Sequence, residues 1–133
     1  MFLKKVLIGL ILILLLTFCD SPTNSIVGTK EDIKIDNVSF VIDTTYLKSS
    51  IFYAKGRVTN YGNSLIESPW YVEAQFYTDA TYKLKLGGNY TEIGVPLEPY
   101  QSTFWLLTFS ASTTDLNQYP NFRVGDLRAI YKK

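Results

Sequence analysis

Hydrophobic and polar residues alternate along much of the chain after residue 31. In one run the apolar residues Phe52, Ala54 and Val58 alternate with Tyr53, Lys55, Arg57 and Thr59. In a second run Trp70, Val72, Ala74 and Phe76 alternate with Tyr71, Glu73, Gln75 and Tyr77. This period of two is typical of β-strands with one face in a core and the other in water.

Seven segments of this kind follow one another at close spacing, which predicts an all-β fold. The predicted strands cover residues 32–43, 50–60, 69–78, 82–86, 90–96, 102–110 and 121–131. Gly87 and Gly88 are interpreted as a two-residue hairpin turn, because glycine adopts positive φ freely. A helical turn is expected from Ser112 to Gln118, with Ser112 as its cap. The pattern favours an immunoglobulin-like antiparallel β-sandwich of about seven strands over residues 31–133.

Two predicted strands change the phase of their alternation, at Asp36–Asn37 and at Gly125–Asp126. A one-residue bulge would return each apolar set to a single face, and bulges are common at sheet edges. We therefore expect the first and last strands at edges. The run Phe104–Leu107 is apolar at every position, which fits either a central strand covered by residues 110–121 or an exposed docking surface.

The N-terminal residues have the organisation of an export signal. Lys4 and Lys5 precede an unbroken apolar stretch that begins at Val6, and the only cysteine is Cys19. The thirteen residues from Val6 to Phe18 would span roughly 20 Å as a helix, less than the ~30 Å hydrocarbon core of a bilayer. We therefore predict a signal peptide over residues 1–18.

The sequence Leu16-Thr17-Phe18-Cys19 resembles the lipobox of bacterial lipoproteins, although Phe18 is larger than the residue usual there. The resemblance implies that Cys19 carries a lipid and that residues 19–30 form a polar tether. We expect the protein at the cell membrane, facing the periplasm or the cell exterior, with the choice of membrane left open. An uncleaved anchor and an unmodified buried cysteine are the alternatives.

Composition argues against common catalytic and cofactor chemistry. The chain has no histidine and one cysteine, so imidazole bases, zinc sites and disulfides lack their residues. No glycine-rich phosphate loop is present. Without Lys4 and Lys5 the chain has 11 basic and 12 acidic side chains, a balance that does not favour nucleic acid. We expect no enzyme activity, no metal and no cofactor.

Three segments together resemble FxLYD-type domains. They are Gly56–Asn60, Trp70–Asp79 and Leu97–Phe104, and the resemblance covers about residues 33–131. FxLYD-type domains are small immunoglobulin-like sandwiches of bacterial secreted proteins and lipoproteins. The resemblance implies a fold and an envelope location, and it provides no catalytic residue to carry over.

The outward residues of the two alternating runs are the candidate partner-binding residues, because tyrosine offers broad amphipathic contact at low entropic cost. One group is Tyr53, Lys55 and Arg57, and the other is Tyr71, Glu73, Gln75 and Tyr77. Strand propensity alone also explains exposed tyrosines. We expect a non-catalytic, membrane-tethered binding or structural module whose partner is an envelope protein or a glycan.

Two other functions stay open. An immunity- or exclusion-type lipoprotein would block an incoming protein through one exposed aromatic face. A carboxylate-dependent envelope hydrolase would bring two acidic side chains together in a concave pocket. Its candidates are Glu67, Glu73, Asp79 and Glu92.

Overall fold

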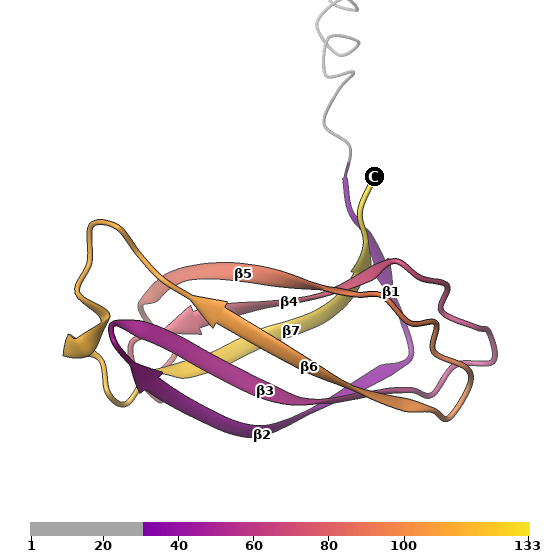
Figure 1. Ribbon diagram of the computed structural model, residues 1–133, viewed down its shortest axis with the longest axis horizontal. Coiled ribbons are helices and arrows are strands. Elements are labelled where there is room, and N and C mark those ends of the chain that lie inside the picture. The colour runs from indigo at the N-terminus through magenta and orange to yellow at the C-terminus, as the bar shows by residue number, and fades with distance from the viewer. Residues whose placement is uncertain (1–30) are drawn as a thin grey trace, which may run out of the picture. The chain divides into compact units, whose positions relative to one another are not determined.

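The computed structural model describes residues 31–133 of the chain. These residues fold into seven antiparallel strands in two sheets, with loops between the strands (Figure 1). In chain order the strands are β1 (Ile33–Ile35), β2 (Val38–Lys48), β3 (Ile51–Asn60), β4 (Trp70–Tyr77), β5 (Lys85–Ile93), β6 (Ser102–Phe109) and β7 (Arg123–Tyr131). A short 3₁₀ helix, η2 (Leu116–Gln118), lies between β6 and β7. The predicted signal peptide, Cys19 and the tether lie outside the described residues.

The strands form a four-stranded sheet in the order β1-β7-β4-β5 and a three-stranded sheet in the order β2-β3-β6. The chain therefore crosses between sheets after β1, β3, β5 and β6. Inward side chains of both sheets form the core, which includes Phe52, Trp70, Val72, Phe76 and Leu107. This arrangement confirms the predicted all-β sandwich. Within residues 31–133, no helix is long and apolar enough to cross a membrane.

The phase change at Asp36–Asn37 separates two strands and does not form a bulge within one. Asn37 has φ 59°, and the chain leaves the four-stranded sheet after β1 to enter the three-stranded sheet as β2. The bulge of β2 lies further on, between Ile42 and Thr44, where Asp43 has no partner in the register with β3. The predicted first strand is thus two strands in different sheets.

The predicted hairpin at Gly87–Gly88 is wrong, because both glycines lie inside the continuous strand β5. Gly88 is opposite Gln75 of β4, and a Cβ added there would lie 2.5 Å from the Gln75 Oε1 atom. The Gln75 side chain covers Gly88 and could move aside, whereas Gly87 has φ 152° and a Cβ there would lie 2.7 Å from the Phe109 ring. The two-residue hairpin loop that the structure shows joins β2 to β3 at Ser49 and Ser50, which have φ of 52° and 58°.

The phase change in β7 does form a bulge. The pairing of β7 with β4 shifts between Glu73 and Gln75, and Asp126 has φ 53°. The expected edge position of this strand is wrong, because β7 lies between β1 and β4. The expected helical turn is confirmed as η2 only in its last residues, and Asp115 caps it in place of Ser112.

Candidate partner-binding surface

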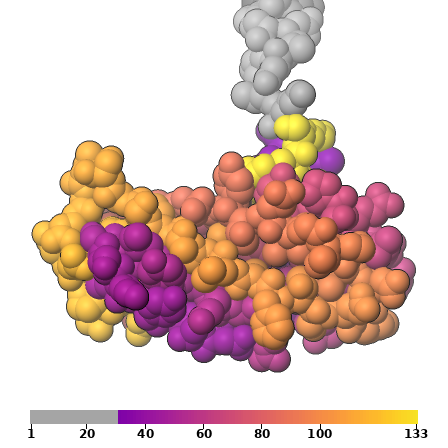
Figure 2. All heavy atoms as spheres, in the orientation of Figure 1, coloured from indigo at the N-terminus to yellow at the C-terminus, as the bar shows by residue number. Residues whose placement is uncertain are grey.

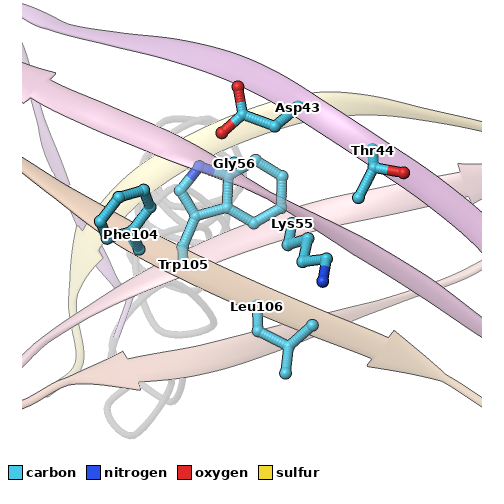
Figure 3. Close-up of a pocket in the computed structure, with 7 residues that line it drawn as sticks. All are labelled: Asp43, Thr44, Lys55, Gly56, Phe104, Trp105 and Leu106. Atoms are coloured by element: carbon cyan, nitrogen blue, oxygen red, sulfur yellow. The ribbon is translucent and has the colours of Figure 1, made fainter.

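Alternate residues of β2, β3 and β6 point away from the core and form what we call the outer face of the three-stranded sheet (Figure 3). The register places Arg57 of β3 between Val41 and Phe104, and Lys55 between Thr44 and Leu106. Of the first predicted group, Tyr53, Lys55 and Arg57 therefore all lie on this face. In Figure 2 the purple atoms of β2 and the orange atoms of β6 both reach the surface toward the viewer.

The apolar part of this face is uncovered. Phe104 is 76% exposed, Leu106 49% and Val41 47%. The expectation of a central strand covered by residues 110–121 is wrong, because β6 is at the edge of its sheet. Residues Asp115 to Asn117 of that segment instead bond to Ser50 at the β2–β3 hairpin. The outer face is open in the described part of the chain.

The bulge residue Asp43 is paired with Arg57. Arg57 Nη2 lies 3.1 Å from Asp43 Oδ1, and Arg57 Nε lies 3.3 Å from Asp43 Oδ2. The hydrogen bond to Asp43, aided by the charge of its carboxylate, raises the pKa of Arg57. A two-point contact of this kind fixes the orientation of the guanidinium. The alternation of β3 predicted that Arg57 points outward, but its partner depends on the bulge.

A stacked pair of tyrosines lies beside this ion pair. The rings of Tyr46 and Tyr53 are parallel within 6°, with centroids 4.6 Å apart. Lys55 Nζ lies 5.8 Å from the Tyr46 centroid, within the range of a cation–π contact. Stacking and the cation restrict both rings, so they offer contact area with little mobility left to lose.

A cleft of ≈480 Å³ opens on this face (Figure 3). Its lining is Asp43, Thr44, Lys55, Gly56, Phe104, Trp105 and Leu106. A Cβ at Gly56 would lie 1.8 Å from the carbonyl oxygen of Val41 and 2.9 Å from the Trp105 ring, so only glycine fits there. Trp105 is 3% exposed, and its Nε1 has no hydrogen-bond partner among the described residues. Clefts of this size with apolar walls and few polar groups are typical of ligand and anchor sites.

The second predicted group lies on the other sheet. Tyr71, Glu73 and Gln75 share the outer side of β4 and are each partly buried. Glu73 is paired with Arg128; its hydrogen bond raises the pKa of Arg128. The Tyr71 ring meets Tyr90 edge-on at 5.8 Å. On this side Glu73 is thus engaged by Arg128, and the Tyr71 ring by Tyr90.

The expected exposure of Tyr77, the last residue of the second group, is wrong. Only 9% of the Tyr77 surface is exposed to solvent. Tyr77 stays on the outer side of β4, opposite Lys85 and Arg123, but Tyr82 and the Lys85 ammonium group cover its ring. Its hydroxyl donates a hydrogen bond to Asp126, and its ring meets Tyr82 edge-on. The structure therefore separates the two predicted groups onto opposite sides of the sandwich and removes Tyr77 from the exposed surface.

The candidate carboxylates are not gathered in the described part of the chain. Each of four concavities there is lined by one carboxylate, either Asp36, Asp43 or Asp79. Asp79 accepts hydrogen bonds from the hydroxyl and backbone N–H of Thr81, which lower its pKa. Residues 31–133 hold no group of three or more His, Cys, Asp or Glu that could bind a metal.

Sequence reasoning missed Asp43 as a site residue and left Phe104 and Leu106 open between two interpretations. The apolar run of β6 was the available signal for the latter two, whereas nothing in the sequence indicated the pairing of Asp43. No protein-family model matches the chain, and neither a curated protein nor a solved structure does. The resemblance to FxLYD-type domains stays an expectation drawn from the residues quoted above.

Proposed function

We propose that this chain is a non-catalytic lipoprotein of the bacterial envelope, tethered through Cys19, whose sandwich binds another envelope protein through the outer face of the three-stranded sheet. The observation that carries the proposal is the exposure of Phe104 and Leu106 beside a cleft. Contiguous apolar surface on a small domain is costly in water and marks interaction sites.

The composition of the outer face supports binding to a protein. Interfaces are enriched in aromatic residues and arginine, and this face presents Tyr46, Tyr53, Arg57 and Phe104 together. All of them lie on paired strands, so their positions are set by backbone hydrogen bonds and not by a loop. A preformed surface lowers the entropic cost of association.

The sequence before residue 31 supports the tether. A short apolar stretch leads to Cys19, and residues 20–30 are mostly polar. Eleven residues reach at most about 40 Å when extended, which would keep the domain close to the membrane that holds the lipid.

The tether is tested by mass spectrometry of membrane-extracted protein, with Cys19→Ala beside the parent. We expect a diacylglyceryl mass increment and loss of residues 1–18 in the parent, and neither in the variant. A diacylglyceryl increment in both proteins, or in neither, would contradict lipid attachment at Cys19.

The binding face is tested by photo-crosslinking in cells. A benzophenone side chain replaces Phe104 in one variant and Tyr90, an exposed aromatic of the opposite sheet, in the other. We expect one discrete protein adduct at position 104, none at position 90, and a weaker adduct when Cys19 is also replaced by Ala. Equal labelling at both positions would contradict a specific face.

An immunity- or exclusion-type lipoprotein would use the same uncovered face. The crosslinked protein separates this candidate from the first, because its partner would come from outside the cell. A carboxylate-dependent hydrolase has less support, since each concavity described above is lined by a single carboxylate.

A further inference from the structure

We infer that the cleft on the outer face of the three-stranded sheet receives an apolar side chain of the partner protein from a segment in which carboxylates flank that side chain. The inference rests on the proposed function and gives the chemistry of its partner.

The walls of the cleft suit an apolar anchor. Phe104 and Leu106 stand on one side, and the floor is closed by Gly56 and the Trp105 ring. In Figure 3 Phe104 and Leu106 project from β6, while Asp43 and Thr44 project from β2 across the cleft. Well-packed pockets that bury one aromatic or aliphatic side chain commonly dominate the energy of an interface.

The charges around the cleft select an acidic segment. The outward positions of the three strands carry Lys48, Lys55 and Arg57 against one carboxylate, Asp43. Arg57 is already paired with Asp43, whereas Lys55 and Lys48 have no carboxylate partner within residues 31–133. Residues 31–133 as a whole carry ten basic and eleven acidic side chains. A cationic face on a domain that is not cationic favours an anionic partner.

A protein segment fits this face better than a bilayer surface. Each cation near an anionic membrane contributes only about 1 kcal/mol, and three are present around one carboxylate. Asp43 lines the cleft, and lipid headgroups of like charge would lie against it. A peptide can place its carboxylates near Lys55 and its apolar side chain in the cleft.

The test is a titration of the full-length chain in zwitterionic nanodiscs, followed by NMR of the two tryptophan indole N–H groups. Trp105 reports on the cleft because it lines it, and Trp70 is the internal control because its Nε1 donates to Val95 O at 2.9 Å. The probes are acetyl-Glu-Phe-Leu-Glu-amide, acetyl-Lys-Phe-Leu-Lys-amide and acetyl-Glu-Ser-Ser-Glu-amide. We expect the first to shift the Trp105 signal alone, the second to bind at least about fivefold more weakly, and the third to cause no shift.

Two pairs of variants locate the effect. Phe104→Ala should weaken the acidic apolar peptide by more than about tenfold, and its matched control Tyr90→Ala should not. Lys55→Glu should remove the preference for the acidic peptide, whereas Lys85→Glu on the opposite sheet should keep it. All four altered residues are exposed, so the fold is expected to persist and circular dichroism checks it.

Four results would overturn the inference: no shift with any peptide, equal binding of the basic peptide, shifts at Trp70 alone, or a Trp105 shift caused only by changing to anionic lipid. The last would indicate docking on the bilayer. If crosslinking at position 104 still captures an envelope protein, the proposed function stands and only the acidic, apolar chemistry of its partner fails.

Discussion

Among residues 31–133, one polar residue is buried: Asn60, with 1% of its surface exposed. Its Nδ2 donates to the carbonyl oxygens of Ser64 at 2.8 Å and Leu97 at 3.0 Å, and its Oδ1 accepts from Gly62 N–H at 2.9 Å. One side chain thus ties the connection after β3 to the connection before β6. It is also the last residue of the segment Gly56–Asn60 that resembles FxLYD-type domains.

We expect Asn60→Ala to lower the free energy of unfolding by roughly 1 to 3 kcal/mol, because the partly buried Gly62 N–H and Ser64 carbonyl lose the Asn60 amide as a partner and the Leu97 carbonyl keeps only its bond from Ile66 N–H. Urea denaturation measures the change. Asn63→Ala, at an exposed position of the same turn, is the control and should change stability by less than about 0.5 kcal/mol. Similar values for the two variants would show that the Asn60 amide does not join the connections.

Tyr77 should make stability depend on alkaline pH. Its hydrogen bond to Asp126, burial and the nearby carboxylate charge raise its pKa. Because the folded-state pKa lies above the unfolded value, the stabilisation is fully present below about pH 10 and is lost as pH rises through the folded-state pKa. The difference in unfolding free energy between the parent and Tyr77→Phe should therefore shrink above pH 10, as urea titrations at several pH values would show. A difference that stays constant up to pH 11.5 would contradict this.

At the scale of elements, the hairpin between β2 and β3 is joined to η2 by one of its two serines. The Oγ of Ser50 accepts from Leu116 N–H at 3.1 Å and donates to Asp115 at 3.3 Å. Ser49 has a similar backbone conformation, and no hydrogen bond of its side chain appears among the described residues. The two neighbours therefore form a matched pair.

We expect Ser50→Ala to destabilise the domain by about 1 to 2 kcal/mol, because the partly buried N–H of Leu116 loses its acceptor. Ser49→Ala should cost at least about 0.5 kcal/mol less. Urea denaturation compares the two, and hydrogen exchange of the Leu116 amide should accelerate only in Ser50→Ala. Equal exchange in both variants would indicate that η2 is held by other contacts.

Alternation predicted β3 and β4 within one residue at each end, because their inward residues are core residues. It failed for β5, because a pair of glycines also indicates a turn, whereas Gly87 and Gly88 both pair with β4. Gly87 is a glycine for another reason, since its φ is 152° and a Cβ there would lie 2.7 Å from the Phe109 ring. The same limit applies to the site. Outward positions such as Lys55 and Arg57 follow from period two, but the side taken by Asp43 depends on a bulge. The burial of the outward residue Tyr77 depends on the covering side chains of Tyr82 and Lys85, which the alternation of β4 does not reveal.

At the scale of the whole molecule, two phenylalanines separate stability from binding. Phe52 is fully buried, and its ring stacks on Phe122 with centroids 3.9 Å apart. Phe104 belongs to the neighbouring strand β6 and points into solvent. The sandwich therefore rests on an aromatic cluster from both sheets, while the outer face contributes little to it.

Phe52→Ala should cost about 3 to 5 kcal/mol of unfolding free energy through the cavity that it leaves. Phe104→Ala should change stability by less than about 0.5 kcal/mol. Thermal and urea unfolding of both variants measure the contrast. A large loss of stability for Phe104→Ala would show that this side chain has a structural role and would remove the main support for a binding face.

The pairing of β1 with β7 determines where a fused protein would emerge from the domain and how the domain would respond to a pulling force. Ile33 is opposite Tyr131, and Asp32 lies 3.7 Å from Lys132. Residue 31 and the carboxyl terminus therefore leave the sandwich at one end (Figure 1). A reporter fused after Lys133 would emerge beside residue 31, whereas an insertion near residue 113 would lie away from β1. Traction on residue 31 would first shear the three residue pairs that join β1 to β7, making this short ladder the weakest link under mechanical force.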